Sequence, residues 1–84
     1  NPFNLKTNIR FQIAELGFVS LKVYDVLGNE IATIINEEKS TGTYEVEFNA
    51  TGLPSGVYCY QLRVISTFTQ AATFVQTRKM IFLK

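Results

Sequence analysis

Histidine and tryptophan are absent from this 84-residue sequence, and it has only one cysteine, one methionine and two prolines. Without histidine or paired cysteines, the chain lacks the usual ligand sets for zinc. It also has no serine placed as in a nucleophile elbow, so no nucleophile–base pair is apparent. Cys59 cannot form a disulfide within the chain, and its apolar neighbours predict a buried structural thiol. We therefore expect no enzyme activity, no metal and no cofactor.

The sequence has little net charge and no long apolar run. Eight basic and seven acidic residues give a net charge of +1, and the longest run of charges, residues 37–39, is mixed in sign. Nucleic-acid-binding proteins usually have a basic stripe, so no nucleic-acid partner is expected. No stretch reaches the roughly 18–20 apolar residues that cross a bilayer, so no membrane-spanning segment is expected. The sequence begins at Asn1 and has no signal peptide, which is typical of a fragment or a processed product.

The hydrophobic and aromatic contents are high enough for a stable core. Of the residues, 46% are hydrophobic and 13% aromatic, which is too apolar for a disordered segment. A chain of this length buries only about 60–65% of its unfolded surface, so the core must be efficient. We expect residues 1–84 to form a single domain that folds without a metal or a disulfide.

Apolar and polar residues alternate with a period of two through most of the chain. In residues 18–26, for example, Val19, Leu21 and Val23 fall on one face of an expected strand. The expected strands are residues 8–14, 18–26, 30–36, 44–48, 57–65 and 74–83, with a seventh if residues 1–6 also pair. No segment has the pattern of a helix that would connect two parallel strands. The prediction is an all-β fold, an antiparallel immunoglobulin-like β-sandwich of six or seven strands.

Turn residues separate these segments. Gly28 can adopt a positive φ, as a short hairpin with a bulge requires. Residues 37–42 are interpreted as a polar loop, residues 49–56 as a turn cluster and residues 66–73 as a Ser/Thr-rich turn. Residues 57–65 are apolar on both faces, so this strand is expected to be central. Glu45 and Glu47 share one face of their strand, and solvation is the role expected for both.

Four segments carry a resemblance to one family. Residues 1–4 (NPFN) and 7–11 (TNIRF) resemble the opening NPFNPxTxIxF of the C-terminal sorting domains of the type IX secretion system. Residues 19–31 are similar to the family's VxLxVYDxxGxxV segment, and residues 42–44 and 53–58 to its GxY and LxxGxY stretches. Residues 77–84 resemble its terminal TxKMxxxK. Leu5 stands where the family usually has proline, and residues 66–73 are longer than its usual hairpin.

The resemblance implies a function. Such domains occur at the C-terminus of secreted proteins of Bacteroidetes and related bacteria, and the outer-membrane translocon recognises them. A surface sortase then often removes the domain and can attach the cargo to an anionic lipopolysaccharide. The expected partners are therefore the translocon, the sortase and an upstream cargo protein, and the expected location is secreted or at the cell surface. The VYDxxGxxV hairpin is also similar to the immunoglobulin-like module of flagellar hook-capping proteins.

The residues that match these motifs have two interpretations. As structure, Tyr24, Asp25 and Gly28 form a hairpin and Gly56 and Tyr58 a turn and part of the core, with the tyrosine hydroxyl at the rim. As recognition sites, the same residues would contact the translocon. The same two possibilities apply to the terminal lysines, Lys79 and Lys84. A lysine on an edge strand prevents aggregation, whereas the family's lysine motif implies recognition by the translocon.

A second function class remains open from sequence. A β-sandwich of this size could be a filament-forming structural subunit that self-associates through its terminal strands, with residues 1–11 inserted into a neighbour. A sorting module should be monomeric and should direct a fused reporter to the surface. A filament subunit should elute as a polymer.

Overall fold

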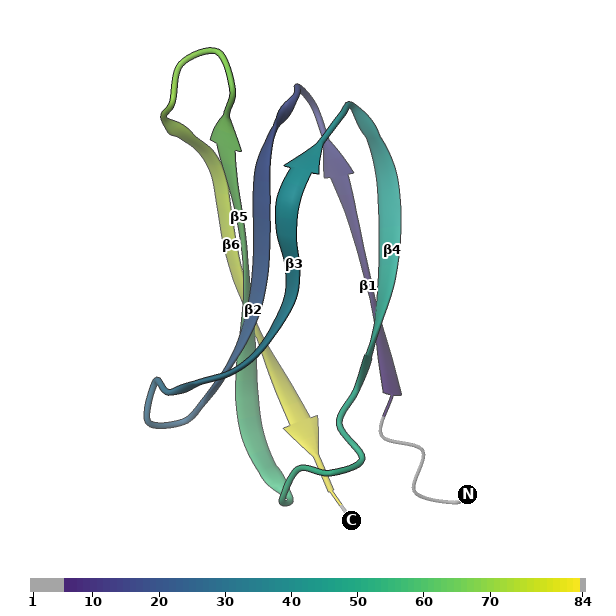
Figure 1. Cartoon of the computed structure of the whole chain (residues 1–84). Helices are drawn as coiled ribbons and strands as arrows, with labels where there is room; N and C mark the ends of the chain where they lie inside the picture. The colour runs from purple at the N-terminus through teal and green to yellow at the C-terminus, as the bar shows by residue number, and fades with distance from the viewer. Residues whose placement is uncertain (1–5, 84) are drawn as a thin grey trace.

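The computed structural model of this chain describes residues 6–83, which form six strands (Figure 1). The strands are β1 (Lys6–Ile13), β2 (Gly17–Asp25), β3 (Glu30–Lys39), β4 (Gly42–Asn49), β5 (Gly56–Ser66) and β6 (Ala72–Phe82). All pairings are antiparallel, and the described residues contain no helix. The predicted all-β antiparallel sandwich of six strands is confirmed. Apart from Lys6, the possible seventh strand over residues 1–6 lies outside the described residues.

The strands form two sheets of unequal size. β1 pairs with β4 in a two-stranded sheet, and the other four strands form a sheet of order β3-β2-β5-β6. β5 lies between β2 and β6, as its two apolar faces predicted. The short β3–β4 connection joins the two sheets along one side. On the other side, β1 and β6 each have one unpaired edge (Figure 1).

The core lies between the two sheets and follows the predicted alternation. Val19, Leu21 and Val23 of β2 are completely buried. Leu21 is paired in register with Leu62 of β5, which is also buried, so the two leucines lie side by side at the centre of the larger sheet. The remaining buried apolar side chains are Ile9, Phe11, Ile13, Ile35, Phe48, Ala50, Tyr58, Val64, Met80 and Phe82.

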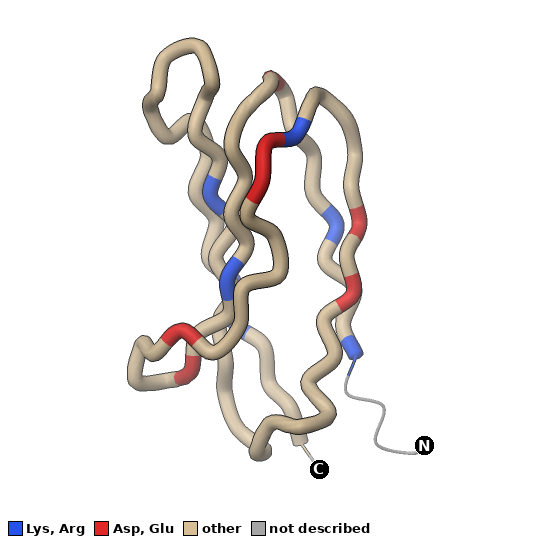
Figure 2. Tube along the Cα trace, viewed as in Figure 1, with Lys and Arg blue, Asp and Glu red and all other residues tan. Residues whose placement is uncertain are grey.

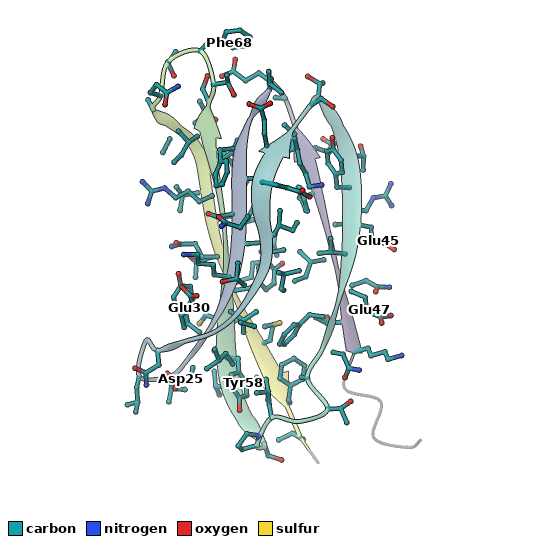
Figure 3. The ribbon with its side chains drawn as sticks, in the orientation of Figure 1. Asp25, Glu30, Glu45, Glu47, Tyr58 and Phe68 are labelled. Atoms are coloured by element: carbon teal, nitrogen blue, oxygen red, sulfur yellow. The ribbon has the colours of Figure 1, made fainter. Side chains whose placement is uncertain are left out.

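The polar face of the small sheet is solvated, as predicted. Glu45 and Glu47 of β4 point away from the sandwich (Figure 3). On β1, Arg10 is the register partner of Glu45, and the Lys6 amine lies 3.8 Å from Glu47. On this small sheet the charges are divided by strand, with basic residues on β1 and acidic residues on β4 (Figure 2). These exposed pairs contribute little to stability.

One loop prediction was wrong. Residues 37–42 were expected to form a polar loop, but β3 continues through Glu37 and Glu38 to Lys39. These residues pair with the first residues of β2, so the sheet ladder satisfies their backbone. The Lys39 amine lies 3.1 Å from Glu37 and 4.6 Å from the centre of the Tyr44 ring. Tertiary pairing therefore overrides the low strand propensity of the sequence.

The prediction of a buried thiol was also wrong. Cys59 is only partly buried. It lies between Tyr58 and Tyr60 on β5, and neighbouring side chains of a strand point to opposite faces. Tyr58 faces the core, so Cys59 faces outward, although its local sequence is apolar.

The β5–β6 hairpin has an ordered turn. Ser66 is completely buried, and its hydroxyl accepts hydrogen bonds from the backbone N–H groups of Phe68 (3.2 Å) and Thr69 (3.3 Å). The Thr67 N–H donates to the carbonyl oxygen of Leu16. The tip carries Phe68, whose side chain is exposed (Figure 3). These side-chain and backbone hydrogen bonds hold the turn of a hairpin whose register the sequence left open.

Candidate functional site

The motif residues singled out from the sequence meet at one end of the four-stranded sheet. β2 ends there at Asp25, and β5 begins there at Gly56. Tyr24 is the register partner of Cys59, which in turn is the partner of Lys79 on β6. These three side chains form a row on the outer face of the sheet. Residues that are far apart in sequence thus lie next to one another.

The next row of the ladder faces the core. Asp25, at the end of β2, is the register partner of Tyr58, and Tyr58 is the partner of the buried Met80. Gly28 lies in the adjoining β2–β3 hairpin. Lys84, the remaining predicted recognition residue, lies outside the described residues.

The Asp25 carboxylate organises the β2–β3 hairpin. One oxygen accepts the backbone N–H groups of Leu27 and Asn29, both at 2.9 Å, and the other accepts the Asn29 side-chain amide at 3.1 Å. Gly28 adopts a φ of 85° and donates its N–H to the Asp25 carbonyl at 3.1 Å. The structural interpretation of Asp25 and Gly28 is confirmed. The hairpin therefore presents two exposed aliphatic side chains, Val26 and Leu27, on a fixed backbone.

These hydrogen bonds favour the charged form of Asp25. The backbone N–H of Asn29, followed by its side-chain amide, lowers the Asp25 pKa below the usual 3.8. The pKa of Glu30, at the start of β3, is also lowered, first by the hydroxyl of Thr33 and then by Lys22, whose amine lies 3.2 Å away. Asp25 and Glu30, which flank the turn of the β2–β3 hairpin, are both labelled in Figure 3.

An acid titration tests this account of the hairpin. A depressed pKa means that the Asp25 contribution to stability is present above pH 3.8 and is lost as the pH falls through the folded-state pKa. We expect Asp25→Asn to remove this part of the acid sensitivity, because the amide oxygen still accepts backbone hydrogen bonds but does not titrate. Carbon-detected NMR of the carboxyl group, with melting curves between pH 5 and pH 2.5, measures both quantities. A carboxyl pKa at or above 3.8 would contradict the assignment.

Tyr58 joins the turn to the core. It is 7% exposed, its ring centroid lies 5.7 Å from that of Phe82, and its hydroxyl donates to the carbonyl oxygen of Pro54 at 2.7 Å. A tyrosine near the start of a strand that bonds back to an upstream carbonyl is the tyrosine corner of immunoglobulin-like sandwiches. The prediction of a core ring with its hydroxyl at the rim is confirmed.

The same corner occurs a second time, and the sequence analysis missed it. Tyr44 at the start of β4 donates its hydroxyl to the carbonyl oxygen of Ser40, also four residues upstream and also at 2.7 Å. In both cases a glycine precedes the tyrosine by two residues, and the ring lies against that glycine, Gly42 or Gly56. The repeated Gly-x-Tyr spacing was visible in the sequence and could have predicted both corners.

The outer surface at this end is mainly apolar with one cation. We call it the terminal face and define it by Tyr24, Val57, Cys59, Lys79 and Ile81. Val57 and Ile81 are register partners next to the Cys59–Lys79 pair, and they are 36% and 60% exposed. Within the described residues, no carboxylate forms an ion pair with Lys79. Adjoining exposed apolar side chains, as on this face, mark a candidate protein-binding surface.

Within residues 6–83, no three or more His, Cys, Asp or Glu side chains are grouped so that they could hold a metal ion. The same part of the chain contains no helix whose length and hydropathy would allow it to cross a membrane.

Comparison with known families matches residues 1–81 to one family, described as the secretion system C-terminal sorting domain. The match therefore covers nearly all of the chain, including all the strands except the end of β6. No curated protein and no solved structure matches the chain.

Proposed function

Because this chain belongs to the family of secretion system C-terminal sorting domains, we propose that its terminal face is the surface that a type IX outer-membrane translocon recognises. A sorting domain of this family implies an attached cargo protein, a secretion system and a secreted or cell-surface destination. The route that we propose is export through the translocon, and the surface that the translocon contacts is the terminal face. The translocon binds the folded sandwich by its terminal face, and the cargo is exported with it. A surface sortase then acts on the exported protein.

The observation that carries this proposal is the convergence of three separate motifs. Residues 24–28, 56–58 and 79 come from three segments of the chain, yet strand register brings them to one end of one sheet. Core packing explains why Tyr58 occupies its position, and turn hydrogen bonding explains Asp25 and Gly28. Neither explains the exposed Lys79, which lies on the edge strand β6, where a lysine also discourages pairing with another sheet. Its side chain therefore remains available for a partner.

The chemistry of the terminal face supports a non-catalytic role in binding. Val57 and Ile81 supply apolar surface, and the Lys79 amine can pair with a carboxylate of the partner. The surface is preorganised, because β2, β5 and β6 are held by continuous ladders and the neighbouring hairpin by Asp25. Rigid surfaces lose little conformational entropy on binding.

A reporter fusion tests the proposal. The domain would be fused behind a periplasmic reporter in a cell with a type IX system, and reporter on the cell surface would be measured. We expect Lys79→Ala to lower surface reporter by about tenfold, since loss of a buried interfacial charge pair costs at least about 1.4 kcal/mol of binding. Lys79→Glu should lower it further.

The matched control is Arg63→Ala. Arg63 is an exposed cation on the same outer face, on β5 and away from the terminal face, and its register partner is Val75. Its removal should leave surface reporter unchanged. Normal export of the Lys79→Ala fusion, with both variants folded and equally abundant, would exclude this terminal face. Absence of surface reporter from the unmodified fusion would exclude the sorting function itself.

Point substitutions are more informative here than deletion of residues 77–84. That deletion removes Met80 and Phe82, which are 9% and 7% exposed and belong to the core. A truncated domain would lose export through unfolding, whatever surface the translocon binds.

The alternative of a filament subunit makes a different prediction. It draws support from the unpaired edges of β1 and β6, which could pair with another chain. Size-exclusion chromatography with light scattering distinguishes the two functions. A monomer is expected for a sorting domain and a polymer for a filament subunit.

A further inference from the structure

The two unequal sheets leave part of the sandwich interior uncovered. On the inner face of β6, Met80 and Phe82 are buried, whereas Phe74, six residues before Met80 on the same face, is 46% exposed. Phe74 nevertheless faces inward, because its register partner on β5 is the buried Val64. An exposed aromatic ring on the inner face of a sheet indicates that one covering element is missing.

A groove occupies the place of that covering element. It runs between the free edge of β1 and the inner face of β6. Phe11, Gln12, Ala14, Phe74 and Gln76 line it, together with two charged residues, Arg10 and Glu15. β4 pairs with the other edge of β1, so the backbone groups on the groove side of β1 have no strand partner among residues 6–83. An apolar floor beside an open strand edge is the arrangement into which an extended peptide inserts by strand addition.

A cation beside the groove, next to the lining residue Gln76, indicates what the peptide carries. Arg78 also faces inward on β6, opposite the partly buried Tyr60, and its side chain is exposed. With its amide oxygen turned toward the guanidinium, Gln76 accepts hydrogen bonds from Nη2 at 2.9 Å and Nε at 3.1 Å of Arg78. Within the described residues, no carboxylate pairs with Arg78. The guanidinium is therefore held in place with donors left for a carboxylate from elsewhere.

We propose that the β1–β6 groove binds an extended segment of another protein, which pairs with the free edge of β1 and places an apolar side chain over Phe74 and an acidic one over Arg78. A strand of residues 6–83 from a second copy is not the occupant, because each of these strands is already held in its own sheet. This groove lies on the interior side of β6, whereas the terminal face is on the outside. It is thus a second binding surface, beyond the sorting function.

The probe is a synthetic peptide as long as one strand. Threonine occupies every second position, and the positions between the threonines face the groove when the peptide pairs with β1. Its inward positions include a valine followed four positions later by a glutamate, which matches the separation of Phe74 and Arg78 along β6. Fluorescence anisotropy of the labelled peptide with the unmodified domain measures binding. Hydrogen–deuterium exchange locates it. We expect saturable binding, weakened by salt, with new amide protection confined to β1.

Charge exchange makes the test specific. Arg78→Glu should weaken binding of the glutamate peptide by about tenfold, through the lost attraction and the added repulsion. A peptide with lysine in place of glutamate should restore binding to the Arg78→Glu variant. Arg63→Glu makes the same change on the outer face and should leave binding unaltered. Phe74→Ser should weaken both peptides.

Several outcomes would overturn the proposal. One is the absence of saturable binding to the folded domain. Another is equal binding of the glutamate peptide by the Arg78→Glu and Arg63→Glu variants. A third is new amide protection on a strand edge other than that of β1. Concentration-dependent dimerisation of the free domain that competes with the peptide would assign the groove to a second copy instead. Melting curves of each variant establish that it is folded. The substituted side chains of Arg78 and Arg63 are exposed, so both variants should melt close to the unmodified domain.

Discussion

Replacing Tyr58 with alanine is expected to lower the free energy of unfolding by about 4 kcal/mol, as truncation of a buried aromatic ring commonly does. The ring is 7% exposed and packs on Phe82, and its hydroxyl holds the Pro54 carbonyl. A domain of this length has a total stability of only about 4–13 kcal/mol. The variant should therefore be largely unfolded at temperatures just below the melting temperature of the unmodified domain. Export of its cargo should fall with it, if the translocon reads the folded shape.

Tyr58→Phe separates the hydroxyl from the ring. It keeps the packing but leaves the Pro54 carbonyl without its donor, so a loss of about 1–2 kcal/mol is expected. The matched control is Tyr24→Phe, since the Tyr24 hydroxyl donates no hydrogen bond within residues 6–83, and its removal should change stability by less than about 0.5 kcal/mol. Urea unfolding followed by circular dichroism measures all three variants. Equal stability of Tyr58→Phe and Tyr24→Phe would show that the corner hydrogen bond contributes nothing.

Gly17→Ala is expected to lower the free energy of unfolding by about 1–3 kcal/mol through overpacking. A Cβ at this buried position would lie 2.7 Å from the carbonyl oxygen of Ile65 and 3.1 Å from Val64 Cγ1. The first neighbour is backbone, so a side-chain rotation cannot relieve the contact, and β2 must move away from β5. The shift should appear in NMR spectra as changed amide resonances along both strands.

Two other glycines serve as controls for Gly17. At Gly28 an added Cβ meets nothing within 4 Å, but φ is +85°, so alanine should cost about 1 kcal/mol through backbone strain alone. At Gly52 there is open space and no such φ, so alanine should change stability by less than about 0.5 kcal/mol. If Gly17→Ala were as mild as Gly52→Ala, the close approach of β2 to β5 would be excluded.

The alternation of side chains was sufficient to predict the strands, because burial on one face imposes a period of two. Val19, Leu21 and Val23 show this most clearly, since all three are completely buried. The turn at Gly28 was also predictable, because few residues adopt a positive φ without strain. Alternation also places Cys59 on the outer face, because Tyr58 and Tyr60 on either side of it face inward, and the apolar composition of this segment is a poorer guide to burial.

Other features depend on contacts between residues that are distant in the sequence, so local sequence patterns could not predict them. β3 extends to Lys39 because β2 offers it a ladder, although Glu37 and Glu38 are poor strand formers. The terminal face exists only through the register of β2, β5 and β6, which places Tyr24 and Lys79 in one row. The groove follows from the unequal size of the two sheets, and no local pattern indicates how many strands each sheet will have.

The position of β6 at the end of the strand order has a consequence for synthesis. Phe82 packs against Phe48 and Tyr58, so the interior closes only after the ribosome has translated the chain as far as this residue. A polypeptide released before that point would carry its cargo but no finished sandwich. A receptor that binds only the closed shape would pass over such incomplete products. Sorting would then depend on the synthesis of β6.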